Sequence, residues 1–592
     1  MRQKSMMTAL FFCAVIAGCS GCMEPKEQTS SEEAVQEDAF VEQAVEINTE
    51  EEIHIRDQKL LYENQDNTEI VTMYLTVSRG NAAEGTDHTW EEINTYSAYD
   101  YEEMGVDRYQ VAGLLQIGDE NGLISGELGY GQVSSNCTVQ IRGQSSSKGA
   151  QKNYKIKIKE NKGDWRGQRT IALNKHQSEG LRFRNKLAFD MLADVEELMS
   201  LRTTFVHLYV KDLTESEDAK FEDYGIYTQV EQLNKTALER HGLDKRGHLY
   251  KINLCEFYRY EDAIVLKDDP AYDVTKFEEI LEIKGDDDHT KLITLLEKIN
   301  DYSIPIEEIL EEHFDIENVT YWLAFNMLVG NIDTQNRNFY IYSPQNSERW
   351  YIYPWDLDAM LRRTEYKILE SSNYESWESG VSNYWGNILF RRCLKSDYFR
   401  EELDKAVEDL HELFSEEYIN SYVQEYSALV KPYVYSGQDL IYAPLTEEEY
   451  DQVVAAIPAE MQDNYDRYQE SLEKPMPFYI GVPENTEDGY MVTWDSSYDF
   501  DFEDITYCFE LSDEYTFENL ILKEDELQIP AMSFSTLEPG QYFMRVTAKN
   551  ESGKTQHAFD YYSLSRGGKA YGMKCFYVDA DGQIVEDAYA ED

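Results

Sequence analysis

Two polar stretches decide the interpretation of this chain: Gly330-Asn331-Ile332-Asp333-Thr334-Gln335-Asn336-Arg337-Asn338 and Tyr353-Pro354-Trp355-Asp356-Leu357-Asp358. In the first, an acid precedes an asparagine by five residues, as in loops where the Asp accepts a hydroxyl proton and the Asn holds a metal ion. In the second, acids follow a predicted strand, where a carboxylate can hold Mg²⁺ across two phosphates. Either stretch alone is also explained by a turn, because Asn, Asp and Gly are turn residues. Their order, with a predicted strand hairpin between them (338–342 and 350–353), favours phosphoryl transfer.

Upstream, a loop rich in Gly and Ser precedes a strand that carries lysines. The loop is Arg142-Gly143-Gln144-Ser145-Ser146-Ser147-Lys148-Gly149, and the strand lies within Gln151-Lys152-Asn153-Tyr154-Lys155-Ile156-Lys157. Backbone N–H groups and hydroxyls in such a loop can cradle phosphate oxygens, which lysines on the next strand can neutralise. Lys155 and Lys157 share one face because strand side chains alternate. An edge strand protected by lysines explains the same residues, and for this cluster alone it is the simpler interpretation.

The chain is long and strongly acidic. Its 592 residues exceed what one core usually serves, so about three or four domains are expected. A formal net charge of −60 argues against a nucleic-acid partner, because such binding depends on Lys and Arg that neutralise phosphates. Any site for an anionic ligand must therefore gather its own cations or metal against the surrounding field.

The N-terminus has the features of a secretion signal. Arg2 and Lys4 precede the apolar stretch 6–16, and Ile16-Ala17-Gly18-Cys19 resembles the site at which bacterial lipoproteins are cut and lipidated. We expect residues 1–18 to be a signal peptide, Cys19 to carry the lipid, and the chain to reside on the extracytoplasmic face of the cell membrane. An ordinary signal peptide that happens to contain Cys is the alternative. Residues 19–65 are acidic and poor in apolar side chains, which predicts a flexible tether.

Strand-like segments dominate the first half of the chain and helical patterns the second, which predicts an α+β body of two lobes. We place its N-lobe at about 66–232 and its C-lobe at about 233–475. Helices are expected over 290–300 and 315–328, the second with Asp315 as its N-cap. Residues 476–566 alternate short strands with turns and predict a small all-β, fibronectin-III-like sandwich, which we expect to be dispensable for nucleotide binding. Residues 567–592 are expected to form a C-terminal tail.

Several blocks together resemble the CotH (spore coat protein H) kinase-like family. The resemblance covers about residues 66–475 and preserves the order of the blocks. It implies an atypical, two-lobed protein-kinase-like core in a secreted or surface-displayed setting. The blocks are the Arg142 loop with its lysine strand, Arg184-Asn185-Lys186-Leu187-Ala188-Phe189-Asp190, Gly225-Ile226-Tyr227 leading to Glu231-Gln232, Asn331-Ile332-Asp333 with Asn338-Phe339-Tyr340, and Trp355-Asp356-Leu357-Asp358.

The resemblance also implies roles for individual residues. Asp333 matches the catalytic acid, Asp356 the metal-binding acid and Asn338 the second metal position, with Asp358 as a further candidate ligand. Lys155 is our choice for the lysine on the α- and β-phosphates, with Lys152 and Lys157 as rivals. Either Asp190 or Glu231 is expected to form the ion pair with that lysine. Alternatively, Glu231 corresponds to the hinge beside the adenine ring. The complete set of predicted ATP-binding residues is Arg142, Ser145, Ser146, Lys152, Lys155, Lys157, Asp190 and Glu231.

Two functions follow from these residues. The first is a kinase that uses Mg²⁺ (or Mn²⁺) and ATP to phosphorylate Ser or Thr of surface or secreted proteins. The second is a catalytically silent scaffold that binds cell-surface proteins or wall glycans. The chain lacks the G-x-G-x-x-G, His-Arg-Asp, Asp-Phe-Gly and Ala-Pro-Glu motifs of ordinary kinases, and ATP is scarce outside a bacterium. Retention of Asp333, Asn338 and Asp356 together favours the first function.

Overall fold

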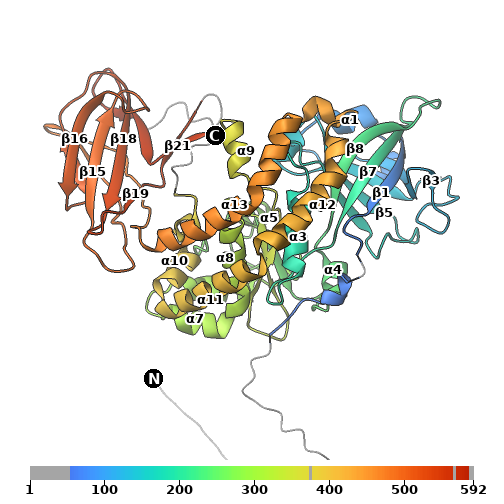
Figure 1. Ribbon diagram of the computed structural model, residues 1–592, viewed down its shortest axis with the longest axis horizontal. Coiled ribbons are helices and arrows are strands. Elements are labelled where there is room, and N and C mark those ends of the chain that lie inside the picture. The colour runs from blue at the N-terminus through green and yellow to red at the C-terminus, as the bar shows by residue number, and fades with distance from the viewer. Residues whose placement is uncertain (1–53, 64, 372–376, 565–567, 586–592) are drawn as a thin grey trace, which may run out of the picture. The chain divides into compact units, whose positions relative to one another are not determined.

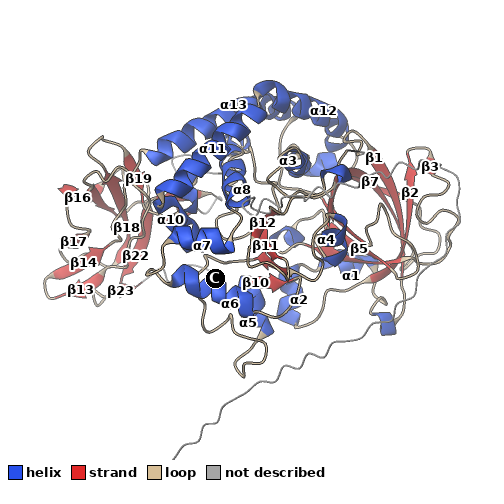
Figure 2. Ribbon diagram, turned by 90° about the horizontal axis from the view of Figure 1, so that it is seen from below, coloured by secondary structure: helices blue, strands red, loops and turns tan. Residues whose placement is uncertain are grey.

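The computed structural model describes residues 54–63, 65–371, 377–564 and 568–585 (Figure 1). The predicted signal peptide, Cys19 and most of the predicted tether lie outside these residues. Within the described ranges, no helix combines the length and apolar character required to cross a membrane. Strands occupy the first part of the described chain, helices dominate the middle, and a second group of strands follows, which confirms the α+β class (Figure 2).

The first part is built on an eight-stranded sheet in the order β1-β7-β8-β6-β5-β4-β2-β3. Strand β1 pairs in parallel with β7 and antiparallel with β2, so the sheet closes on itself as a barrel. Inward-facing apolar side chains form a core of their own, to which the short helices α1 (Trp90–Thr95) and α2 (Ala98–Met104) add Trp90 and Tyr101. The strands are β1 (Ile70–Ser78), β2 (Val111–Asp119), β3 (Gly122–Leu123), β4 (Cys137–Arg142), β5 (Asn153–Ile158), β6 (Thr170–Asn174), β7 (Thr203–Asp212) and β8 (Glu222–Glu231).

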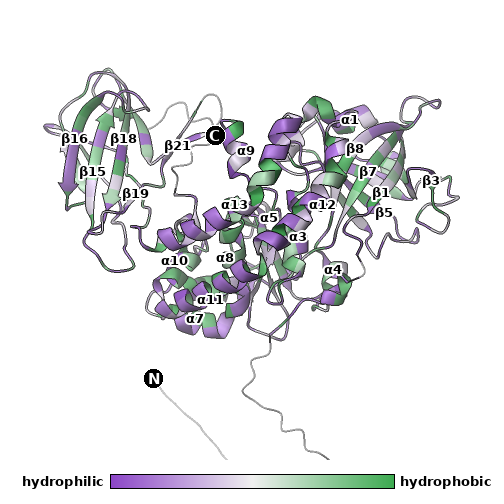
Figure 3. Ribbon diagram, viewed as in Figure 1, coloured by the Kyte–Doolittle hydropathy of each residue, from purple (hydrophilic) through white to green (hydrophobic). Residues whose placement is uncertain are grey.

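The second part combines helices with a four-stranded sheet in the order β10-β9-β11-β12. Helix α8 (Ile316–Leu328) begins where predicted, because the Asp315 carboxylate accepts a hydrogen bond from the backbone N–H of Asn318 at 3.0 Å. In several of these helices hydrophobic and hydrophilic residues alternate along the ribbon, as expected for helices that bury one face (Figure 3). The sheet strands are β9 (His248–Ile252), β10 (Leu281–Ile283), β11 (Phe339–Ser343) and β12 (Tyr351–Pro354). The remaining α-helices are α3 (Arg184–Ala193), α4 (Lys235–Arg240), α5 (Val274–Ile280), α6 (Thr290–Asn300), α7 (Ile306–His313), α9 (Arg363–Ile368), α10 (Ile388–Lys395), α11 (Asp397–Leu413), α12 (Glu416–Val434) and α13 (Glu447–Leu472).

The predicted tether ends earlier than residue 65, because residues 54–62 are packed against the folded core. Asp57 is buried and accepts hydrogen bonds from the Ser200 amide at 3.0 Å and the Tyr62 hydroxyl at 2.6 Å. The Lys59 ammonium donates to the carbonyl of Leu198 at 2.8 Å, beyond the end of α3. The high acid content of the region concealed this docking, since composition does not show which few polar side chains find buried partners.

The C-terminal part contains two facing sheets around a separate apolar core. One sheet has the order β13-β14-β17, and the other has the order β16-β15-β18-β22-β23 with β19 beside β18. Strand β22 pairs with β18 from Gly540↔Val578 to Arg545↔Met573, and β23 pairs with β22, so residues 573–585 of the predicted tail belong to the sandwich. The strands are β13 (Glu484–Thr486), β14 (Gly489–Thr493), β15 (Thr506–Ser512), β16 (Leu520–Leu527), β17 (Ala531–Phe534), β18 (Gly540–Lys549), β19 (Thr555–His557), β20 (Tyr561–Ser563), β21 (Lys569–Tyr571), β22 (Met573–Val578) and β23 (Ile584–Val585).

Candidate active site

An open cleft of about 1560 Å³ is lined by residues from all three parts of the described chain. Its charge balance is opposite to that of the whole sequence, which has 54 Lys and Arg against 114 Asp and Glu. Among the described residues, eight basic side chains and six acidic ones line the cleft, so it concentrates positive charge as an anionic ligand requires. The basic residues are Arg108, Arg142, Lys155, Lys251, Lys284, Arg337, Arg362 and Lys569, and the acidic residues are Glu278, Glu282, Asp333, Asp356, Asp358 and Glu378.

The β11–β12 hairpin brings the two decisive stretches together. Phe339 pairs with Pro354, so the loop that ends at Asn338 and the turn that begins at Trp355 leave the same end of the hairpin. The side-chain amide of Asn338 donates to the Asp333 carboxylate at 2.7 Å and to the backbone carbonyl of Asp333 at 3.1 Å. The Asp333 side chain is 53% exposed, so an incoming hydroxyl can reach it. Its pKa is raised because the cleft wall desolvates it on one side, although Arg337 opposes this shift.

The Trp355–Asp358 turn presents two carboxylates in different environments. Asp356 has φ 55° in the left-handed region, and its carboxylate is exposed to the cleft. No hydrogen bond or ion pair ends on Asp356 within the described chain; desolvation and the neighbouring Asp358 charge raise its pKa to about 6. Asp358 instead lies 3.0 Å from Nδ1 of His176. Burial would raise the pKa of Asp358, but the hydrogen bond with His176 outweighs it and lowers the pKa.

Helix α3 holds this turn in place through Asn185. The Asn185 side-chain carbonyl accepts a hydrogen bond from the Leu357 amide at 3.1 Å, and its amide group lies 3.3 Å from Nε2 of His176. Asn185 belongs to one of the sequence blocks quoted above. The sequence therefore marked this residue as part of the family pattern, but it did not indicate that Asn185 holds the Trp355–Asp358 turn. His176 carried no signal in the sequence, because an isolated His has no diagnostic spacing.

The Gly- and Ser-rich loop also lines the cleft, to which Arg142, Ser145, Ser146 and Lys155 all contribute. Gly143 has φ 86°, and a Cβ added there would lie 2.1 Å from Oγ of Ser146. The loop therefore requires glycine at this position, both for its backbone conformation and for its close packing. Arg142 also stacks over the Trp355 ring at 5.8 Å, which joins this loop to the Asp356 turn.

Of the three candidate lysines, only Lys155 lines the cleft. Lys152 is buried and donates to the Ser147 carbonyl at 2.6 Å, so it braces the loop from behind. Lys157 is exposed beyond the lining. The pKa of Lys155 is lowered by burial and by the nearby cations Lys284 and Lys157, and within the described chain no ion pair involves Lys155.

Neither Asp190 nor Glu231 is brought to Lys155, which corrects both predicted partners. Asp190 lies on α3, but it pairs with Lys186 of the same helix at 2.8 Å and accepts a hydrogen bond from Tyr426. Neither acid lines the cleft. The sequence could not show this, because partner choice depends on how α3 packs against α12.

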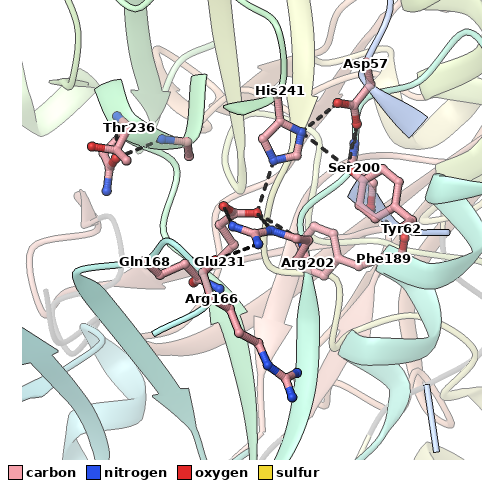
Figure 4. A network of polar contacts seen from close by, with 12 residues as sticks. Asp57, Tyr62, Arg166, Gln168, Phe189, Ser200, Arg202, Glu231, Thr236 and His241 are labelled. Carbon is pink, nitrogen blue, oxygen red and sulfur yellow. Dashed lines mark hydrogen bonds and ion pairs between the residues drawn. The ribbon is translucent and has the colours of Figure 1, made fainter. Parts of the chain in front are cut away.

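Glu231 belongs to a buried polar network, shown in Figure 4, that joins the N-terminal segment to the end of β8. It accepts from Nε of Arg202 at 2.9 Å and lies 3.1 Å from Nε2 of His241, whose Nδ1 is 2.6 Å from Asp57. Burial favours the neutral acid, but hydrogen bonds from His241 and Arg202 reverse this effect and lower the pKa of Glu231 to about 2. The network has a structural role, because it links buried elements and none of these four side chains lines the cleft.

The C-terminal part also reaches the cleft, which the sequence did not indicate. Tyr561 of β20 and Lys569 of β21 are among the lining residues. Lys569 pairs with Glu378 at 3.1 Å, and Trp377 donates to the Phe559 carbonyl at 3.0 Å. Tyr561 falls in the predicted sandwich range and Lys569 in the predicted C-terminal tail, so both of these regions line the cleft. That the sandwich is dispensable for nucleotide binding stays a prediction.

Comparison with known proteins agrees with the quoted blocks. The family described as "CotH kinase protein" matches residues 139–468, more than half of the chain. The inner spore coat protein H of Bacillus subtilis is 24% identical over 304 residues, which cover 50% of this chain and 77% of that protein.

Two solved structures show weak likenesses. The proinflammatory kinase CtkA of Helicobacter pylori is 10% identical, with 54% of this chain and 94% of that chain covered, at a TM-score of 0.27. HipA, in a Shewanella oneidensis complex with HipB and operator DNA, is 11% identical, with 57% and 59% covered, at a TM-score of 0.22. Neither score is high enough to define the fold of this chain. The family match together with the preserved blocks shows that the chain belongs to the CotH kinase family.

Proposed function

We propose that this chain is an atypical kinase that transfers the γ-phosphate of ATP to Ser or Thr of surface or secreted proteins. The observation that carries the proposal is the cleft, because Asp333, Asn338 and Asp356 line it together with the Arg142 loop and Lys155. Such a constellation fits phosphoryl transfer, because that reaction depends on positioning and on neutralisation of phosphate charge.

The donor atoms in the cleft fit a hard divalent cation. Asp356 offers an exposed carboxylate without a hydrogen-bond partner in the described chain, and Asn338 offers an amide oxygen at the same end of the β11–β12 hairpin. Carboxylate and amide oxygens are ligands that Mg²⁺ accepts, and Mn²⁺ shares this preference. We assign Asp356 and Asn338 to the metal, with Asp358 as a further candidate that His176 already engages. The metal, when bound, supplies positive charge to the phosphate oxygens.

Asp333 orients the acceptor hydroxyl and receives its proton in this scheme. The Asp333 carboxylate is exposed, and a 2.7 Å hydrogen bond from the side-chain amide of Asn338 fixes its orientation. Lys155, Arg142 and the hydroxyls of Ser145 and Ser146, which line the same cleft, bind the phosphates. The raised pKa of Asp333 makes it a better proton acceptor than an ordinary carboxylate, which suits a general base.

The setting of the enzyme is part of the proposal. Residues 1–18 and Cys19 support a lipid-anchored protein on the extracytoplasmic face of the membrane, with surface or secreted proteins as substrates. The fibronectin-III-like character of the sandwich stays part of this proposal, and the pairing of a three-stranded sheet with a larger antiparallel sheet supports it. A silent scaffold that binds surface proteins or wall glycans remains the second candidate, favoured by the missing kinase motifs.

The test compares Asp356→Asn with Asp333→Asn in the chain from residue 54 onward. We expect Asp356→Asn to weaken Mg²⁺-ATP binding in calorimetry and to abolish transfer from labelled ATP. Asp333→Asn should leave nucleotide affinity nearly intact and reduce turnover on the order of 10²-fold or more. Asp463→Asn, which changes an exposed acid outside the cleft, is the matched control. Equal loss of nucleotide affinity in both variants would show that the roles are wrongly assigned, and Mg²⁺-ATP binding without any transfer by the unmodified chain would favour the scaffold.

A further inference from the structure

The C-terminal part places a lysine in the cleft beside the candidate catalytic acid. Lys569 on β21 lines the same cleft as Asp333, although 236 positions separate them in the chain. Hydrogen bonds tie the Asp333 loop to the short helix 380–384: the Gln335 side-chain amide donates to Asn383 at 2.8 Å, and the hydroxyls of Thr334 and Tyr384 lie 2.9 Å apart. Lys569 pairs with Glu378, two residues before that helix, so the lysine and the Asp333 loop meet at the same end of the cleft.

The lysine is held there by contacts on both sides of the junction, and its partner Glu378 is buried. Its ammonium pairs with Glu378 at 3.1 Å and lies 4.5 Å from the centre of the Tyr561 ring. The Tyr571 hydroxyl donates to the same Glu378 carboxylate, and Tyr571 packs into the main apolar core. A lysine carried by a loop would lose much side-chain entropy on binding a phosphate, but these contacts already restrict Lys569.

Three other cations in the cleft have partners of their own. Arg142 stacks on Trp355, and Arg362 pairs with Glu365 at 2.7 Å. Lys284 pairs with Glu282 on the wall near Lys155. Arg337 belongs to the Asp333 loop itself, and Lys569 is the cation that the C-terminal part adds to the cleft.

We propose that Lys569 contacts the phosphoryl group that is transferred, so that the C-terminal part completes the active site. This inference rests on the proposed function. As the bond to the leaving oxygen weakens, negative charge spreads over the phosphoryl oxygens, and a preorganised cation there stabilises the transition state. Nothing covalent forms on the lysine: its ammonium keeps its proton and donates hydrogen bonds.

The first test compares turnover in the full chain for Lys569→Met, Lys569→Arg and Lys554→Met. Lys554 is the matched control, because it has the same 39% side-chain exposure and pairs with Glu473 at 2.9 Å, yet it does not line the cleft. We expect Lys569→Met to reduce turnover on the order of 10²-fold with Mg²⁺-ATP affinity nearly unchanged, and Lys569→Arg to recover part of the rate. Lys554→Met should retain the wild-type turnover. Equal turnover in Lys569→Met and Lys554→Met would overturn the inference.

The second test does not require turnover. An acyl-phosphate derivative of ATP transfers its acyl group from the terminal phosphate to a nearby lysine amine, which forms an amide and releases ATP. Peptide mapping should find this label on Lys569, and excess Mg²⁺-ATP should prevent it. Label on Lys155 without label on Lys569 would overturn the inference and leave the proposed function standing. Absence of ATP-protected label on every cleft lysine would overturn both.

Discussion

The charge on His241 should make the docking of residues 54–62 depend on pH. Burial alone would lower the pKa of His241, but hydrogen bonds to Asp57 and Glu231 reverse this and raise it from 6.5 to about 9. That difference corresponds to about 3 kcal/mol. Because the folded-state pKa is raised, the stabilisation is fully present below about pH 6.5 and is lost as the pH rises through about 9. Glu231 stays beside His241 when residues 54–62 detach, so we assign about half of this free energy, about 1–2 kcal/mol, to docking.

Hydrogen exchange of peptides that cover residues 54–62 measures this free energy. After correction for the intrinsic exchange rate, protection should fall about tenfold between pH 6.5 and pH 9, since about 1.4 kcal/mol is a factor of ten. His241→Gln should remove most of this pH dependence. His289→Gln is the control, because His289 is also buried but its pKa is lowered by desolvation, so its protonation does not change in this range. Retention of the full pH difference in His241→Gln would refute the assignment of the effect to this network.

The remaining predictions concern other parts of the chain. Mass spectrometry of the mature N-terminus should find a diacylglyceryl group on Cys19, and an unmodified start elsewhere would contradict the predicted anchor. Arg184→Met should lower the free energy of unfolding by about 3–5 kcal/mol in thermal melts, because it leaves the buried carboxylates of Glu179 and Glu365 without their shared cation. Gly143→Ala should weaken ATP binding in calorimetry while the circular dichroism spectrum is unchanged, since the added Cβ distorts the loop. Truncation after residue 475 should increase the rate of limited proteolysis of the remaining core, and an unchanged rate would mean that the sandwich docks without stabilising it.

Local patterns in the sequence were sufficient for much of the fold. The alternation over 154–158 identified β5, and helical spacing with an N-cap at Asp315 identified α8. These features depend on contacts between near neighbours in the chain, where side-chain periodicity reports burial directly. The approach of the Asn338 loop to the Asp356 turn was predictable for a similar reason, because the short hairpin between them returns the chain to the same end.

By itself, the sequence determined the α+β class, the order of the family blocks and the short-range geometry of the Asp333–Asp358 region. Tertiary structure alone decided the closure of the barrel through β1, the engagement of Asp190 and Glu231 away from Lys155, and the arrival of Lys569 in the cleft. The physical reason is that an ion pair or a cleft wall joins segments far apart in the chain. A carboxylate pairs with whichever cation packing brings near while both are desolvated, and no local pattern encodes that choice.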